Sequence, residues 1–383
     1  MLQRILSVLT LVVCLSLMVV PLSARADTDY TSAKQAIMLD YDTGMVMFEK
    51  NADEKMPTSS MSKVMSMYLV FEGLRNGKLL LDSELKVSEK AWRKGGSKMF
   101  VEVGNRVKVE DLIRGVVVQS GNDATIVLAE GLAGSEDAFA MALTEKAKEL
   151  GMENSQFKNA SGWPDPEHYS TARDLATLAH RMITDFPEYY SYYGEEEFTY
   201  NNIRQQNRNP LLYRDIGADG IKTGHTEAGG YGLMASGTRG DRRVILVVNG
   251  LEDEKARAQE GARLLEWGLK GFSNYELFNA GDEVLQARVA MGQSVDVPLV
   301  VEEDVLVTIP MNLKNDLKVE AVYDAPLVAP VRAGDQIGVL KIVVPRGETL
   351  ELPLYAGADV KGLGFFAKTM MKAKILAGGR VDG

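Results

Sequence analysis

The stretch around which the chain is organised reads PTSSMSKVMSMYLVF and runs from Pro57 to Phe71. The proline and threonine at its start favour entry into a helix. Ser60 and Lys63 lie three positions apart, so they share one face of the predicted helix and their side chains can meet. The apolar residues that recur at helical spacing, and that we expect to face a core, are Val64, Met67, Tyr68 and Phe71.

A serine next to a lysine can be a nucleophile next to its base. A serine hydroxyl reacts poorly unless an adjacent base takes its proton. Lysine can act as that base when burial or a second cation lowers its pKa enough to leave the amine neutral. The Ser-x-x-Lys pattern occurs at three places, which are Ser60/Lys63, Ser83/Lys86 and Ser155/Lys158. Taken alone, it indicates no more than a serine and a lysine on a solvated helix, so other motifs have to single out Ser60.

The N-terminal residues have the pattern of a targeting segment. Arg4 supplies a positive charge, the run from Ile5 to Pro21 is mostly apolar, and Ala24-Arg25-Ala26 is a small-x-small cleavage site. We therefore expect residues 1–26 to be a signal peptide and the mature chain to start at Asp27 and work outside the cytoplasm. A retained membrane anchor is the alternative, and the short run and the cleavage site argue against it.

Length and charge limit the classes of protein that fit. At 383 residues the chain is longer than one ordinary domain, so two are expected. Its one cysteine, Cys14, lies in the predicted signal peptide, so the mature chain has no disulfide and depends on its core. The mature chain holds 41 basic residues (43 minus Arg4 and Arg25) against 53 acidic residues, a net charge of −12. That balance argues against a nucleic-acid partner.

Residues 27–271 read as a mixed α/β domain in which helices sit among an antiparallel sheet. Alternating apolar residues around Asp42-Thr43-Gly44 predict a β-hairpin over Ala36 to Lys50. Apolar runs and helix signals predict helices over Val109 to Val118, Ala124 to Leu132, Phe139 to Leu150, Leu175 to Ile183 and Asp253 to Leu269. Short runs over Tyr231 to Thr238 and Arg243 to Val248 predict antiparallel strands. Because strands come both early and late, we expect the two ends of the domain to close the sheet together.

Residues 272–360 read as a small all-β domain without a catalytic constellation. Short β-branched runs separated by Gly-Asp, Asn-Asp and Pro turns predict strands over Val295 to Val301, Asp304 to Ile309 and Ile337 to Val344.

Residues 361–383 read as an amphipathic helix. Leu363, Phe366, Met370 and Ala373 share one helical face, and lysines 361, 368 and 372 share the opposite face. Such a basic amphipathic segment, from Lys361 to Arg380, favours attachment to an anionic membrane surface. The alternative is a terminal helix packed on the body of the protein.

Two further motifs follow Ser60 in order. Ser120-Gly121-Asn122 lies 60 residues after Ser60, and Lys222-Thr223-Gly224 lies 102 residues further on. Ser-x-x-K, a serine-x-asparagine motif and K-T-G together are the motif set of penicillin-binding proteins and class A β-lactamases. Any one of the three is weak, but all three in this order are highly specific.

The chain resembles the low-molecular-mass penicillin-binding proteins that act as serine-type D-alanyl-D-alanine carboxypeptidases. The resemblance covers the signal peptide, the Ser-x-x-Lys domain, the stretch from Asp219 to His225, the β-rich domain and the C-terminal segment. Asn207-Arg208-Asn209 and Arg257 also fall where the family has such residues. It implies a penicillin-binding/β-lactamase-like transpeptidase domain with an antiparallel sheet and helices, followed by the small all-β domain and the amphipathic helix.

The resemblance also implies roles for the site residues. Ser60 would attack the carbonyl of the penultimate D-alanine of a peptidoglycan stem peptide and form an acyl-enzyme, with Lys63 as the base. Ser120 would transfer a proton, Asn122 would bind the peptide amide, and Lys222 would help to hold Lys63 neutral. The terminal carboxylate would be bound by Thr223, Arg208 and Arg257. The backbone N–H groups of Ser60 and His225 would stabilise the oxyanion. Gly224 completes the substrate-binding strand. β-Lactams would acylate Ser60, and the protein would be attached to the outer face of a bacterial cytoplasmic membrane.

No cofactor or metal is expected. The chain has three histidines and no Gly-x-Ser-x-Gly motif, which argues against a Ser-His-Asp triad. It also lacks a His-Glu-x-x-His motif or another metal-ligand cluster, which argues against zinc. The alternatives left open are a β-lactamase, a DD-endopeptidase acting on cross-links through the same site, and a non-catalytic cell-wall binding protein. The β-lactamase hypothesis is disfavoured because no Glu-x-x-Leu-Asn motif lies between Asn122 and Lys222. Asp165, Glu167 and His168 do not form such a motif.

Overall fold

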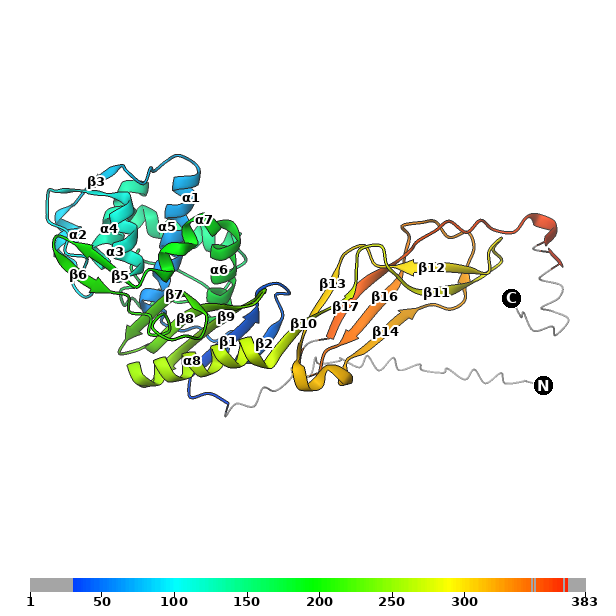
Figure 1. The fold of residues 1–383 in the computed structure, drawn as a ribbon. Helices are drawn as coiled ribbons and strands as arrows, with labels where there is room; N and C mark the ends of the chain where they lie inside the picture. Colours follow the sequence, from blue (N-terminus) through cyan, green and yellow to red (C-terminus); the bar gives the residue numbers. More distant parts are fainter. Residues whose placement is uncertain (1–29, 346, 348, 368, 371–383) are drawn as a thin grey trace, which may run out of the picture.

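The computed structural model describes residues 30–345, 347, 349–367, 369 and 370. The predicted signal peptide and most of the predicted C-terminal amphipathic helix lie outside the described residues. Within the described part of the chain, no helix is long and apolar enough to cross a membrane. Figure 1 shows two bodies side by side, a larger one with helices and strands and an elongated one built of strands.

A five-stranded antiparallel sheet forms the centre of the larger body. Its strands are β1 (Gln35–Asp40), β2 (Val46–Lys50), β7 (Ala218–Thr226), β8 (Gly230–Arg239) and β9 (Arg242–Leu251), in the order β2-β1-β9-β8-β7. The predicted hairpin is confirmed, because β1 pairs with β2 through Ala36 and Lys50. β1 also pairs with β9, so the start and the end of this body share one sheet, as expected.

Helices cover both faces of this sheet (Figure 1). Those gathered over one face are α1 (Lys63–Arg75), α3 (Val109–Val117), α4 (Asn122–Ala133), α5 (Glu136–Glu149) and α6 (Ala172–Asp185). The long helix α8 (Glu254–Gly271) lies along the other face. Along β9, Ile245 and Val247 join the first core, whereas Leu246 and Val248 join the core under α8. This alternation is the side-chain period of a strand, and here both faces are buried.

Short elements complete the larger body. They are the 3₁₀ turns η1 (Ser59–Ser62) and η2 (Ser191–Gly194), the helices α2 (Glu89–Arg93) and α7 (Pro187–Tyr190), and the hairpin strands β3 (Glu84–Lys86), β4 (Arg106–Lys108), β5 (Glu197–Tyr200) and β6 (Ile203–Gln206). The strands pair as β3 with β4 and β5 with β6. None of these short strands was expected from the sequence, because each has three or four residues, too few to establish a period.

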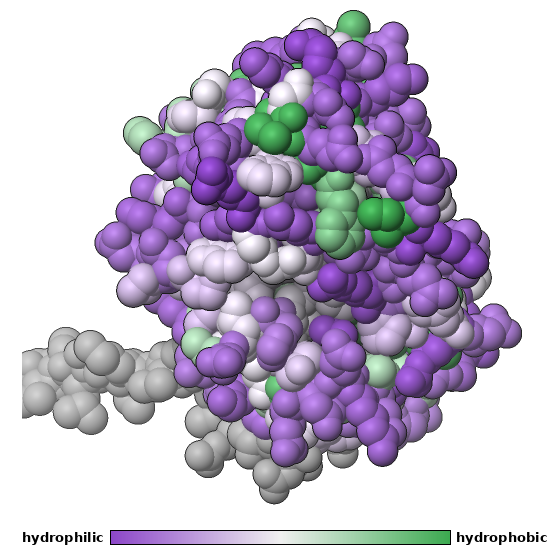
Figure 2. All heavy atoms as spheres, turned by 90° about the vertical axis from the view of Figure 1, so that its left-hand side faces the viewer, coloured by the Kyte–Doolittle hydropathy of each residue, from purple (hydrophilic) through white to green (hydrophobic). Residues whose placement is uncertain are grey.

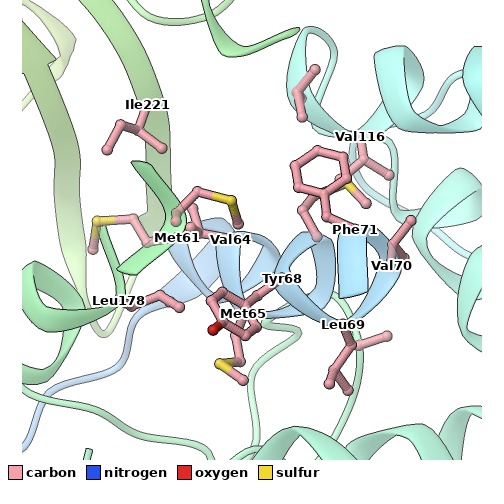
Figure 3. Packing of buried hydrophobic residues seen from close by; sticks show 14 of the residues in the cluster. Met61, Val64, Met65, Tyr68, Leu69, Val70, Phe71, Val116, Leu178 and Ile221 are labelled. Atoms are coloured by element: carbon pink, nitrogen blue, oxygen red, sulfur yellow. The ribbon is translucent and has the colours of Figure 1, made fainter. Parts of the chain in front are cut away.

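Helix α1 differs from its prediction in two respects. The chain enters it through the 3₁₀ turn η1, and the α-helix begins only at Lys63. Every residue from Lys63 to Phe71 is buried, so the helix has no solvated face over that range. Figure 3 shows why: apolar side chains point from α1 in several directions, toward Val116 of α3, Leu178 of α6 and Ile221 of β7. A helix enclosed by neighbours on all sides is apolar all round rather than striped.

The second body is all-β, as predicted, apart from the 3₁₀ turn η3 (Met311–Asp316). A six-stranded sheet has the order β14-β16-β17-β12-β11-β15, and β10 pairs with β13. The bounds are β10 (Phe272–Phe278), β11 (Glu283–Ala290), β12 (Asp296–Val300), β13 (Val305–Pro310), β14 (Lys318–Tyr323), β15 (Leu327–Val328), β16 (Gln336–Val343) and β17 (Thr349–Ala356). This body has an apolar core of its own, which includes Leu299, Val307 and Leu340.

Candidate active site

The predicted nucleophile and base are in direct contact. Lys63 Nζ lies 2.8 Å from Ser60 Oγ and 2.7 Å from the carbonyl oxygen of Ser161. Ser60 stands in η1 and is partly exposed, whereas Lys63 at the first position of α1 is fully buried. The turn and the helix therefore place a reachable hydroxyl against a sheltered amine, which is the arrangement that base-assisted attack requires.

The environment of Lys63 favours a neutral amine. Burial is the main cause, and the positive charges of Arg208 and Lys94 add to it, so the pKa of Lys63 falls to about 7. The nearby carboxylate of Asp123 acts in the opposite direction. Near neutral pH a large share of Lys63 is therefore unprotonated and able to accept the Ser60 proton.

A loop over residues 158–170 holds the nucleophile turn from one side. Gly162 packs so closely on this turn that a Cβ there would collide with the carbonyl of Ser59, and its positive φ of 75° also suits only glycine. His168 Nε2 lies 2.8 Å from Ser62 Oγ, and the Ser62 and Thr58 hydroxyls are 2.5 Å apart. Backbone N–H of Lys158 donates to His168 Nδ1, so the ring proton sits on Nε2 and is donated to Ser62.

The second motif lies where α4 begins. Ser120 is buried with φ of 64°, a strained value for a serine, and its Oγ has no hydrogen-bond partner among the described residues. The Asn122 side chain donates to the carbonyl of Gly95 at 2.8 Å. Asp123 accepts the backbone N–H groups of Met99 and Phe100 at 2.8 and 2.9 Å. The motif thus presents a free hydroxyl and is tied to the loop that follows α2.

The third motif lies on β7 beside the nucleophile turn. A Cβ on Gly224 would stand 2.9 Å from the carbonyl oxygen of Thr58 and 3.2 Å from Ser59 Cβ, so only glycine lets the strand come this close. Lys222 is buried, and burial together with the charges of Lys63, Arg208 and Arg257 puts its pKa well below the ordinary value. Two buried cations repel each other, so Lys63 and Lys222 disfavour each other's charged form, and the charge of Arg208 lowers the pKa of both.

The cations expected to bind a carboxylate surround the same strand. Arg208 Nη1 donates to Ser97 Oγ at 2.6 Å, and Arg257 is buried with an Nε that has no hydrogen-bond partner within the residues that the structure describes. Arg257 lies 5.5 Å from the ring of Tyr231, which in turn stacks on His225 at 3.9 Å. Burial lowers the pKa of both arginines. The side chain of His225 is exposed and that of Thr223 is buried.

The other two Ser-x-x-Lys pairs form no comparable site. Lys86 lies on strand β3 with its side chain exposed. Ser155 is bonded instead to Asp174 at 2.6 Å and to Ser170 at 2.7 Å. The three pairs have the same spacing in the sequence. They differ in the burial of the lysine, which the spacing does not show.

Several site residues were not expected from the sequence. They are Ser161, whose carbonyl holds Lys63, and Lys94, Ser97, Asp123 and Trp163, which build the wall next to Asn122. The sequence pattern at Gly95-Gly96 predicts a turn and no site. Its one available signal was the cluster of glycine and lysine residues after α2, which many solvated loops share.

Comparison with known proteins agrees with this geometry. Residues 23–253 match the family model described as D-alanyl-D-alanine carboxypeptidase. The chain belongs to this family. The family resemblance stated from the sequence is therefore confirmed. Within the family, D-alanyl-D-alanine carboxypeptidase DacC of Escherichia coli (strain K12) is 38% identical over 344 residues, which are 88% of this chain and 86% of the relative.

The second body and the fold are also matched. Residues 272–362 match the model described as the C-terminal domain of penicillin-binding protein 5. The crystal structure of the D-alanyl-D-alanine carboxypeptidase DacD from Francisella tularensis aligns with a TM-score of 0.81 at 30% identity, covering 88% of this chain and 96% of that one. Penicillin-binding protein 5 from Haemophilus influenzae aligns with a TM-score of 0.75 at 36% identity, covering 86% and 98%. The predicted fold class is confirmed by these family members.

Proposed function

We propose that this protein is a serine-type D-alanyl-D-alanine carboxypeptidase that removes the terminal D-alanine from peptidoglycan stem peptides. The observation that carries the proposal is the contact of 2.8 Å between Lys63 Nζ and Ser60 Oγ, at a lysine whose pKa is about 7. Family membership supports the reaction, since the relatives named above are D-alanyl-D-alanine carboxypeptidases. We assign the catalysis to residues 27–271 and treat residues 272–360 as a separate domain.

In the acylation step, neutral Lys63 takes the proton of Ser60 while Ser60 Oγ attacks the carbonyl carbon of the penultimate D-alanine. The bond between that carbon and the nitrogen of the last D-alanine breaks, and the leaving amine receives a proton through the Ser120 hydroxyl, which has no hydrogen-bond partner in the described part of the chain. Free D-alanine and a Ser60 ester result. Water then attacks the ester, which releases the shortened peptide and restores the Ser60 hydroxyl.

The remaining site residues bind and orient the substrate. The backbone N–H groups of Ser60 and His225 stabilise the oxyanion, and the Asn122 amide holds the peptide. The terminal carboxylate meets Thr223 and Arg208, with the Arg257 charge behind them. Lys222 adds positive charge beside Lys63 and Arg208. The cost of burying several cations in one place is offset when an anionic substrate enters.

We further propose that the protein acts outside the cytoplasm and is attached to an anionic membrane surface by its C-terminal segment. Support comes from the sequence of residues 361–383 and from the exposure of Phe365, Phe366 and Met370, which leave apolar surface free at this end. β-Lactams, which resemble the acyl donor, are expected to acylate Ser60.

The decisive experiment incubates the full chain, purified in detergent, with a peptide ending in D-Ala-D-Ala and measures free D-alanine. Ser60→Ala is the control, and labelling with a fluorescent penicillin reports whether the site is assembled. Release by the wild type alone supports the proposal. Acylation without release of D-alanine would favour a DD-endopeptidase, tested next with cross-linked peptides, and sustained hydrolysis of the penicillin would favour a β-lactamase. Neither release nor acylation would favour a non-catalytic binding protein.

A further inference from the structure

The loop from Lys94 to Val101 forms one wall of the cleft and is held in place by hydrogen bonds. Its backbone is fixed to the second motif, since the carbonyls of Gly95 and Ser97 accept from the side chain and the backbone N–H of Asn122, both at 2.8 Å. The carboxylate of Asp123 accepts the N–H groups of Met99, Phe100 and Val101. These bonds to Asn122 and Asp123 hold the wall rigid, and the side chains that it carries are presented at defined positions.

At one end of this wall an indole lies over the backbone. Trp163, from the loop that holds the nucleophile turn, lies so close to the two glycines that a Cβ on Gly96 would stand 3.2 Å from its ring. Lys94 Nζ lies 4.3 Å from the centre of the same ring. The indole is nonetheless 42% exposed, and Lys94 is only partly buried. Together they present an apolar plane with a cation at its edge.

The residues along this wall indicate in which direction a bound peptide runs through the cleft. Ser97, at the other end of the exposed stretch, contacts Arg208, which belongs to the carboxylate-binding cations. Asn122 lies under Gly95 and Gly96, between the two ends. Trp163 is two residues from Ser161, whose carbonyl holds Lys63 beside the nucleophile. A peptide with its terminal carboxylate at Arg208 therefore extends past Ser60 toward the indole.

Lys94 supplies a positive charge at this end of the wall. Lys94 is close enough for its charge to lower the pKa of Lys63. The acid that faces it, Glu136, is already paired with Lys90 at 2.8 Å. The end of the molecule that carries α2, β5 and β6 is mainly hydrophilic, with only scattered apolar side chains (Figure 2). A charged ligand group with an apolar stem fits such a surface, and a carboxylate fits its sign.

We propose that Lys94 and Trp163 form a subsite for the residue that precedes the penultimate D-alanine, and that this subsite selects a side chain with an apolar stem and a terminal carboxylate. The proposal rests on the function proposed above and adds the substrate class. The indole receives the stem and Lys94 pairs with the carboxylate. A stem that ends in an ammonium group meets like charge instead.

The test uses three N-acetyl tripeptides, X-D-Ala-D-Ala, whose X side chains share a four-carbon stem. X is 2-aminopimelate with a carboxylate, Nε-acetyl-lysine without charge, or lysine with an ammonium group. We expect the full-length wild type to show the highest kcat/KM for the carboxylate and the lowest for the ammonium. Lys94→Glu inverts that order, changing the ratio between the two by roughly tenfold or more. Trp163→Leu lowers kcat/KM for all three.

The matched control is Lys98→Glu, which reverses a charge on the same loop at a lysine whose Nζ donates to the carbonyl of Trp92. Lys94→Gln is the second variant if Lys94→Glu fails to react with fluorescent penicillin, and it reduces the preference without inverting it. If the ratio of kcat/KM between the carboxylate and ammonium peptides is unchanged in both Lys94 variants, or changes equally in Lys98→Glu, the subsite proposal is wrong. D-alanine release in the same assay would still support the proposed function. Release from none of the peptides would instead count against the proposed function.

Discussion

Lys63 shows how strongly the surroundings of a residue decide its chemistry. An exposed lysine is protonated at neutral pH and cannot act as a base. Here full burial and two neighbouring cations bring the pKa to about 7, and the contact with Ser60 gives the neutral amine a proton to accept. The same features explain why Ser83 and Ser155, with lysines at the same spacing, form no second site.

The first prediction concerns pH. Only neutral Lys63 can accept the Ser60 proton, so acylation of Ser60 by a β-lactam should rise with pH around a midpoint near 7, falling by about tenfold per pH unit well below it. Arg208→Gln removes a positive charge, which raises the pKa of Lys63 and shifts the midpoint upward. Stopped-flow acylation rates between pH 5 and 9 measure both. A midpoint that stays in place in the variant would contradict the electrostatic account.

At the scale of elements, the nucleophile turn η1 depends on two neighbours that are distant in the sequence. Strand β7 approaches it at Gly224, and the loop over residues 158–170 approaches it at Gly162 and through His168. Glycine allows the two close approaches, and the neutral imidazole of His168 donates the bond to Ser62.

The second prediction tests the imidazole. His168→Phe removes the ring N–H that the buried Ser62 hydroxyl accepts, and it should lower the free energy of unfolding by about 1–3 kcal/mol and slow acylation. His168→Gln should restore most of both, because its amide can donate. His180→Gln on α6 is the control, measured by urea unfolding and penicillin labelling.

The pKa of His168 gives this contact a pH dependence. Burial lowers that pKa from 6.5 to about 4, so the unfolded chain binds the proton more readily than the folded one between these values. The contribution of His168 to stability is present above pH 6.5 and declines as the pH falls toward 4. Replacement by Gln should flatten this decline, and an identical slope in the wild type and the variant would count against it.

The third prediction concerns the C-terminal segment. Removal of the residues after Val360 should release the protein from vesicles that contain anionic lipid and leave the D-alanine release unchanged, because the site lies in the first body. Co-sedimentation of the full and shortened chains measures this, with neutral vesicles as the control. Equal binding of both chains to anionic vesicles would refute attachment through this segment.

At the scale of the whole molecule, polar residues join the two bodies. Asp40 is fully buried on β1 and pairs with Arg242 at 2.8 Å. Arg242 also donates to the carbonyl of Phe272 at 2.7 Å, and the Asn274 side chain donates to Asp40 at 3.1 Å. The Thr43 and Thr308 hydroxyls are 2.7 Å apart across the same junction. These bonds couple the β1-β2 hairpin to the all-β body.

The fourth prediction follows from this junction. Arg242→Met leaves the buried carboxylate of Asp40 without its cation and should lower the free energy of unfolding by about 3 kcal/mol. The exposed Arg239→Met on β8 should change it little. Urea unfolding measures both variants, and equal stabilities would show that the remaining donors to Asp40 suffice.

Much of the architecture followed from local patterns. The hairpin, the helices α3 to α6 and α8, the strands β8 and β9 and the all-β body were predicted because their apolar periods are long enough to be distinguished. The short strands β3 to β6 and the enclosed state of α1 were not, since a few residues carry no period and an all-apolar helix does not reveal how many neighbours it has.

The sequence by itself determined the family and the order of the three motifs, and it predicted Ser60, Lys63, Ser120 and Lys222 as site residues, because ordered motifs are specific even when each one is common. Only the tertiary structure decided which Ser-x-x-Lys pair is buried, that the Ser161 carbonyl and His168 support it, and that Lys94 and Trp163 share the cleft wall. The physical reason is that burial and proximity arise from segments far apart in the chain. A pKa near 7 belongs to an assembled environment and cannot be read from a local pattern.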